Sequence, residues 1–104
     1  MEKFKGDTFI FQLSIKQENG EDYIFKSGDI IKCGMKKNIG DTKYILEKEI
    51  SVVDSEKEVE IIFESSETKD IKEGEYILEF TLISQRIVNT VYQKAIKIRG
   101  VVNE

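Results

Sequence analysis

The residue types that most often carry out chemistry are scarce in this chain. Histidine is absent, which removes the usual general base near neutral pH and the commonest transition-metal ligand. Cys33 is the single cysteine, and a nucleophilic cysteine needs a nearby base or cation and some exposure. Because Cys33 lies in phase with Ile31 and Met35, we expect it to be an inert core thiol.

Pairs of glutamates two residues apart are the remaining candidates for chemistry. Paired carboxylates act as acid and base in glycosidases, and clustered carboxylates bind calcium. Residues two apart on a strand share one face, however, and glutamates on a solvent face are ordinary solubilising groups. We therefore predict no enzyme activity, no catalytic residue, no cofactor site and no metal site. The pairs are Glu47 and Glu49, Glu56 and Glu58, and Glu73 and Glu75.

The composition limits the partners of the chain. The net charge is -4, and lysines and carboxylates are interleaved, which is a solvating surface and not the basic stripe of a nucleic-acid binder. No apolar stretch is long enough to span a membrane, and the first residues lack the apolar core of a signal peptide. We expect neither nucleic acid nor a membrane as partner, and synthesis and folding in the cytoplasm.

The elements that position these residues follow a period of two, which is the signature of half-buried strands. About seven such segments occur, separated by polar turns at the spacing typical of sandwiches. Lys48 interrupts the apolar phase of the fourth segment, so that strand either bulges or lets Lys48 reach the rim through its stem. The inward-facing residues of these segments span seven ranges, and alternate residues within each range point outward. The ranges are Phe9 to Ile15, Tyr23 to Phe25, Ile31 to Met35, Tyr44 to Val52, Val59 to Phe63, Tyr76 to Leu82 and Tyr92 to Ile98.

This pattern predicts one domain over residues 1–104, an all-β, immunoglobulin-like antiparallel β-sandwich. Asn19-Gly20 predicts a tight turn, and Asn89 is expected in another. A serine N-cap predicts one short helical turn within residues 65–71. The expected core residues are Phe9, Phe11, Leu13, Cys33, Ile61, Phe63, Leu78, Phe80 and Ile98.

The segment around Gly74 and Tyr76 is typical of the tyrosine corner of immunoglobulin-like sandwiches. In such a corner the ring packs at the edge of the core, while the hydroxyl bonds to nearby backbone and pins a crossover between sheets. We therefore assign Gly74 and Tyr76 a structural role.

If the predicted inward residues are correct, a set of isoleucines points outward and would be exposed to solvent in a monomer. Single exposed isoleucines are common, whereas a row of them across neighbouring strands forms an apolar patch that usually marks an interface. Which of them are neighbours depends on the strand order. The outward set is Ile10, Ile24, Ile30, Ile45, Ile62, Ile77 and Ile83, and we take Ile10, Ile45, Ile62, Ile77 and Ile83 as the candidate interface.

Several turns resemble those of small phage proteins related to the N-terminal domain of phage baseplate upper proteins. The resemblance rests on Lys5-Gly6-Asp7-Thr8-Phe9 at the first strand, on Asn19-Gly20 at the first hairpin, and on Ser66 to Ile71 followed by Gly74-Glu75-Tyr76. It spans nearly the whole chain. It implies a free-standing tail, baseplate or fibre-attachment domain located in the virion.

Two functions follow as hypotheses. The first is a structural assembly domain of a phage or prophage particle, which docks on other tail or virion proteins, or on copies of itself, through an apolar sheet face or an edge strand. The alternative is a ligand-recognition module for a host-surface glycan. Its platform would be an exposed aromatic residue among Tyr23, Tyr44 and Tyr92, since tryptophan is absent.

Overall fold

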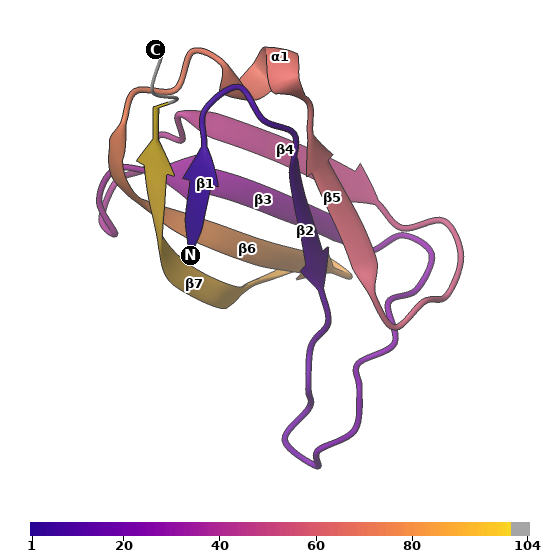
Figure 1. Cartoon of the computed structure of the whole chain (residues 1–104). Coiled ribbons are helices and arrows are strands. Elements are labelled where there is room, and N and C mark those ends of the chain that lie inside the picture. The colour runs from indigo at the N-terminus through magenta and orange to yellow at the C-terminus, as the bar shows by residue number, and fades with distance from the viewer. Residues whose placement is uncertain (101–104) are drawn as a thin grey trace.

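The computed structural model describes residues 1–100, and the final residues of the predicted domain, 101–104, lie outside the described part. The fold is all-β and sandwich-like, as the sequence predicts (Figure 1). A five-stranded sheet has the order β1-β7-β6-β3-β4, and a two-stranded sheet pairs β2 with β5. The elements are β1 (Glu2–Phe4), β2 (Phe9–Leu13), β3 (Ile30–Lys36), β4 (Leu46–Ser51), β5 (Val59–Phe63), α1 (Ser65–Thr68), β6 (Gly74–Ser84) and β7 (Ile87–Arg99).

The core lies between the two sheets, where the inward residues of each strand meet. All nine expected core residues are buried. Aromatic rings join the layers, because Phe11 of the small sheet packs edge-on against Phe80 of the large sheet, with ring centroids 6.1 Å apart. The alternation of the strands therefore produced the expected core.

Two strands differ from the prediction. Tyr23 to Phe25 forms no strand, and around it only isolated bridges join Lys16 to Asp22 and Phe25 to Glu56. The sequence also gave no sign of β1, because three residues are too short to show a period. β1 runs parallel to β7, so the expected antiparallel sandwich contains one parallel pair.

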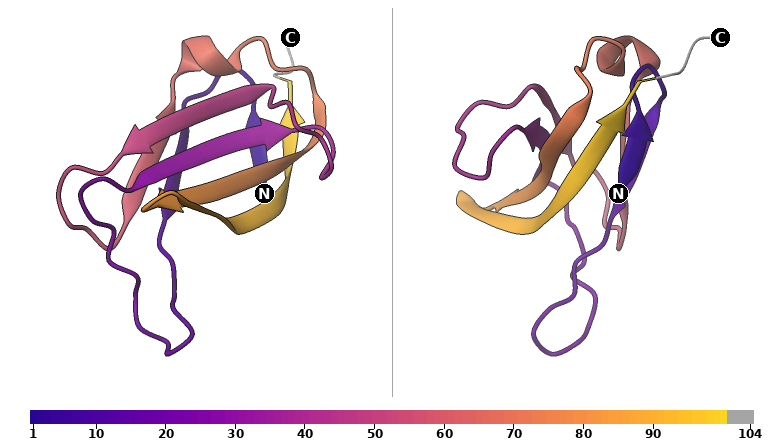
Figure 2. Two further views of the ribbon diagram at one scale, coloured as in Figure 1. Left: turned by 180° about the vertical axis from the view of Figure 1, so that it is seen from behind. Right: turned by 60° about the vertical axis from the view of Figure 1, so that its left-hand side comes forward.

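The chain between β2 and β3 forms a projecting arm, which we define as residues 14–28 (Figure 2). Three backbone hydrogen bonds join its two segments or close its tip, among them Tyr23 N–H to Ile15 O and Gln17 N–H to Glu21 O. The base is anchored by buried Asp29, which accepts hydrogen bonds from the Tyr23 hydroxyl and the Lys26 N–H. The first strand accordingly ends at Leu13, and Ile15 belongs to the arm.

The turns also correct two details. The β6–β7 connection occurs at Gln85 and Arg86, which both have positive φ, and Asn89 is a residue of β7. Helix α1 begins at Ser65, so Glu64 and not a serine occupies the N-cap position. The Glu67 carboxylate accepts the Glu64 N–H at 2.9 Å and so satisfies one free donor at the helix start.

Candidate docking groove

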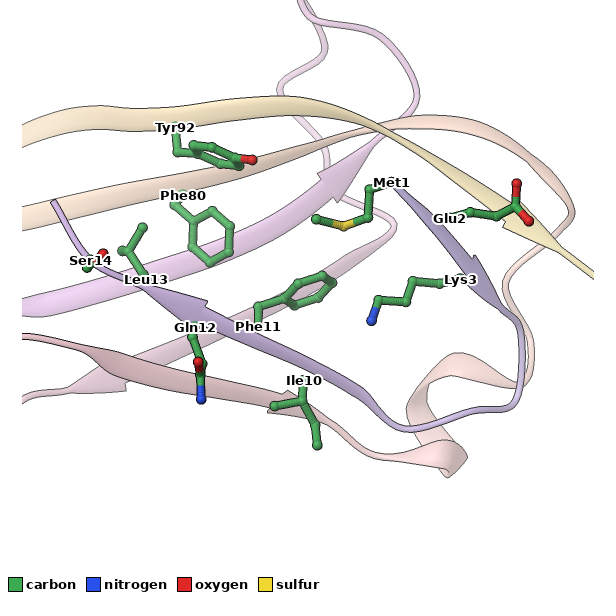
Figure 3. A pocket seen from close by; sticks show the side chains of 10 residues that line it. All are labelled: Met1, Glu2, Lys3, Ile10, Phe11, Gln12, Leu13, Ser14, Phe80 and Tyr92. Atoms are coloured by element: carbon green, nitrogen blue, oxygen red, sulfur yellow. The ribbon is translucent and has the colours of Figure 1, made fainter.

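A groove lies between β1 and β2, where the large and small sheets meet without pairing (Figure 3). We call this junction the open seam. Its cavity volume is about 360 Å³. The floor consists of the rings of Phe11, Phe80 and Tyr92, and Phe80 packs against Tyr92 with ring centroids 5.7 Å apart. Tyr92 is 38% exposed, whereas Phe11 and Phe80 are 5% and 3% exposed, so solvent reaches this apolar floor mainly at Tyr92.

The β2 side of the groove is a free backbone edge. In an antiparallel pair, residues facing each other alternate between hydrogen-bonded and non-hydrogen-bonded pairs. Ile62 faces Ile10 in the register, and its carbonyl accepts a hydrogen bond from Lys48 of β4, on the side away from β2. The Ile10–Ile62 pair is therefore non-hydrogen-bonded. The N–H and C=O groups of Ile10 and Gln12 consequently point into the groove.

The β1 side is a free edge as well. Lys97 donates its N–H to Met1 O, and Lys5 donates its N–H to Arg99 O, so these backbones face β7. By alternation, the backbone groups of Glu2 and Phe4 face the opposite way, towards β2. The Phe4 carbonyl already accepts the Asp7 N–H of the turn at 3.2 Å, which leaves the Glu2 groups and the Phe4 N–H free on this edge. Within residues 1–100 no backbone hydrogen bond joins β1 to β2. The groove therefore has the backbone chemistry to receive an extended chain.

Charge at the rim is positive. The Lys3 ammonium lies 5.6 Å from the centre of the Phe11 ring, while Glu2 is occupied by Arg99 at 3.0 Å. Lys3 and Lys5 form no ion pair among the described residues. An occupant would thus meet apolar rings below it, backbone edges beside it and two lysines near the β1–β2 turn.

The opposite junction, between β4 and β5, is closed by side chains, and we call it the closed seam. The Lys48 ammonium donates to Ile62 O at 2.6 Å and to the Glu67 carboxylate at 2.8 Å. Lys48 faces inward without a bulge in the β3–β4 register, so its stem crosses the seam as the second sequence alternative expected. The sequence therefore predicted that the Lys48 side chain extends to the rim, but it did not identify Ile62 and Glu67 as its hydrogen-bond partners.

Tyr76 makes the contact that a tyrosine corner requires. Its hydroxyl donates to Lys72 O at 2.6 Å, and its buried ring lies beside the segment that links α1 to β6. Gly74 begins β6 with a φ of 149°, a conformation that favours glycine.

The candidate isoleucines lie in four separate places. Ile10 and Ile62 are directly paired on the outer face of the small sheet. Ile77 and Ile83 lie near opposite ends of β6, with Glu79 and Thr81 between them on the same outer face. Ile45 lies near Tyr76 and α1. Ile10 and Ile45 are each 51% exposed, but the five residues do not form one patch.

A polar cluster covers the outer face of the large sheet. Buried Glu79 accepts hydrogen bonds from Tyr44 and Gln93 and pairs with Lys36 at 3.1 Å. The Tyr44 ring lies on Gly34, where a Cβ would overlap it, so the expected inward direction of Tyr44 is wrong. The hydrogen bond to Glu79 raises the pKa of Tyr44 to about 12. Every member has a partner, and the cluster fastens Tyr44 to the sheet.

The other candidates for chemistry have structural surroundings. Burial raises the pKa of the Cys33 thiol to about 12, which keeps it protonated. Among the described residues, no group of three or more acidic or cysteine side chains could hold a metal ion. No helix in residues 1–100 is long and apolar enough to cross a membrane. Of the candidate glycan platforms, Tyr23 and Tyr44 are engaged with Asp29 and Glu79, whereas Tyr92 faces the groove.

The groove was not apparent from the sequence. Its floor joins residues from β2, β6 and β7, and its edges become visible only when the strand order is known. Comparison with known proteins finds no match among protein-family models, curated proteins or solved structures. The phage resemblance therefore stays a prediction.

Proposed function

We propose that this chain is a non-enzymatic assembly domain of a phage or prophage tail or baseplate. It docks by receiving an extended segment of a neighbouring virion protein in the open seam. The observation that carries the proposal is the pair of free backbone edges, β1 and β2, beside an apolar floor. Addition of a strand to a free sheet edge is a common mode of protein recognition.

Edge pairing accounts for the structure better than docking through an apolar sheet face. The five candidate isoleucines are divided among four places, and only Ile10 and Ile62 are direct neighbours. The open seam instead combines backbone donors and acceptors, which supply affinity, with rings that can hold alternate side chains, which supply specificity. Phe11, Phe80 and Tyr92 are the groove residues that would meet such side chains.

A photo-cross-linking experiment in cells that make the particle tests the proposal. We would replace Tyr92 with p-benzoylphenylalanine, which keeps an aromatic ring in the groove, and use the same replacement at Val53 as the control. Val53 is exposed and does not line the groove. Irradiation should join the Tyr92 variant to a virion protein in purified particles and should leave the Val53 variant unjoined.

The two parts of the proposal fail separately in this experiment. If the chain is absent from purified particles, the role in the virion is wrong. If the chain is present but both variants are joined to the same protein equally, or neither is joined, the groove is not the docking site.

A second candidate function is recognition of a host-surface glycan. The observation that favours it is Tyr92, a half-exposed ring in a groove that Ser14 also lines as a polar residue. Sugars stack on such rings and bond to such groups. Binding on a broad glycan array that Tyr92→Ala abolishes would support this function, and an array without signal would count against it.

A further inference from the structure

The free edge of β2 does not stop where the strand ends. In the arm, Ile15 and Gln17 direct their backbone groups across to Tyr23 and Glu21. By alternation, Ser14 and Lys16 direct theirs to the opposite side, in line with Ile10 and Gln12. One continuous unpaired edge therefore runs through residues 10, 12, 14 and 16, from the groove into the arm.

The arm and the groove carry opposite charges. Between residues 16 and 22 the arm has one lysine, Lys16, and three carboxylates, Glu18, Glu21 and Asp22. Lys16 is already paired with Asp22 at 2.5 Å, which leaves Glu18 and Glu21 at the tip. At the other end of the same edge, Lys3 lines the groove and Lys5 lies in the turn between β1 and β2. An arm is thus complementary to the groove of another copy of the chain.

We propose that the occupant of the groove is the arm of a second copy, in a two-fold symmetric dimer. This inference rests on the proposed function of the groove as a strand acceptor. The two edges pair antiparallel, with Gln12 of each copy opposite Ser14 of the other and Ile10 opposite Lys16. The two small sheets then join into one sheet of four strands, and the two-fold axis closes the assembly.

This register places compatible side chains together. Residues directly opposite each other in an antiparallel pair lie on the same face. Ile15 of one copy is therefore opposite Phe11 of the other and extends over the apolar floor of the groove. Beyond Lys16 the arm continues towards the β1–β2 turn, which brings Glu18 and Glu21 towards Lys3, which lines the groove, and Lys5, which lies in that turn.

Charge-swapped variants test the dimer. One variant carries Lys3→Glu and Lys5→Glu, and the other carries Glu18→Lys and Glu21→Lys. Size exclusion with light scattering should give wild type a mass twice the 12.0 kDa of one chain. Each variant alone places like charges at both contacts, and its dissociation constant should rise about tenfold or more. An equimolar mixture restores opposite charges at both contacts and should again form dimers.

A backbone variant tests the edge pairing independently of charge. Ser14→Pro removes an N–H that points towards the second copy, and we expect it to be monomeric. Glu60→Pro is the matched control. Glu60 faces Gln12 in a non-hydrogen-bonded pair, so its N–H points away from β2, to the other edge of the small sheet. It should remain dimeric, and circular dichroism confirms that both variants are folded.

Two results would overturn the arm exchange. One is a wild-type monomer at every concentration tested. The other is a dimer that the charge swaps leave unchanged or that mixing does not restore. Neither result removes the proposed docking function, because the Tyr92 cross-link to another virion protein tests the groove separately. A dimer in solution whose Tyr92 variant is joined in particles only to a second copy of this chain would instead support the arm exchange and overturn the docking of a different virion protein.

Discussion

The two seams of this sandwich both contain unpaired strand edges, but only one of the two seams is covered by a side chain. At each seam a strand of the large sheet meets a strand of the small sheet without backbone pairing. At the closed seam, Lys48 crosses the gap and donates to the free carbonyl of Ile62 and to Glu67. At the open seam, no described side chain bonds to the edges of β1 and β2, and Lys3 lies over the Phe11 ring instead.

The difference shows how a small sandwich can protect one edge and keep another available. An unpaired strand edge is a template for association, and proteins commonly cover it with charged side chains or block it. One lysine is sufficient at the closed seam because the α1 carboxylate holds its ammonium beside the edge. The open seam has no such cover and has an apolar floor, so we expect association there.

Phe80→Ala should have the largest effect, because Phe80 belongs to both the core and the floor of the open seam. Its side chain is 3% exposed and packs against Phe11 and Tyr92. We expect a loss of roughly 3–5 kcal/mol in the free energy of unfolding, a large part of the roughly 5–15 kcal/mol of a typical domain. A denaturant titration measures it. A variant as stable as wild type would mean that Phe80 does not support the core.

Lys48→Met should have the next largest effect, because it removes the side chain that closes the seam. We expect a loss of about 1–2 kcal/mol, since the free carbonyl of Ile62 loses its charged donor while the apolar stem is kept. Lys3→Met is the matched control at the open seam. Lys3 holds no hydrogen bond or ion pair among the described residues, so the control should change stability by less than about 0.5 kcal/mol.

Equal losses in the two lysine variants would remove the distinction between the seams. Chemical denaturation of both, under the same conditions, gives the comparison directly. The variants should be compared as monomers, at low concentration, because association through the open seam would add stability to one of them by mass action.

Tyr76→Phe should cost about 1 kcal/mol and leave the fold intact, because it removes only the hydrogen bond to Lys72 O. Tyr76 fixes the segment that follows α1, and α1 carries the Glu67 that holds Lys48. The closed seam therefore depends on the corner indirectly. Unchanged stability in a denaturant titration would show that the hydroxyl does not pin this crossover.

Local patterns were sufficient to predict the core and the corner from the sequence. Alternation identifies the inward residues of a strand without knowledge of its neighbours, and the nine expected core residues are all buried. The Gly74–Tyr76 segment was also recognisable, because a tyrosine corner bonds within four residues of itself.

Features that depend on distant parts of the chain were not predictable. The position of Tyr44 is set by Gly34, which leaves room for the ring, and by Glu79, which accepts from the hydroxyl. Sequence alternation placed Tyr44 inward because it ignores such contacts. The groove was unpredictable for the same reason, because it depends on contacts between distant parts of the chain. Its strand β1 is too short to show an alternating pattern, and its free edges follow from the strand order. The outward isoleucines were therefore a poor guide to the site.

The smallest predicted effect is a pH dependence confined to the closed seam. The hydrogen bond from Lys48 lowers the pKa of the Glu67 carboxyl, with help from the Glu64 N–H. The folded-state pKa thus lies below the value of 4.5 for a free glutamate. This contribution to stability is present above pH 4.5 and is lost as the pH falls through the folded-state pKa.

Glu67→Gln should flatten the acid side of a plot of stability against pH, and Lys48→Met should flatten it to a smaller extent, because the Glu64 N–H still lowers the pKa of Glu67. The double variant should resemble Glu67→Gln alone, because Glu67→Gln already removes the carboxylate to which Lys48 donates. Lowered pKa values at Asp22, Asp29 and Glu79 leave acid sensitivity elsewhere, so the test is the difference from wild type. Additive flattening in the double variant would show that Glu67 and Lys48 act separately, and that the seam is not closed by their contact.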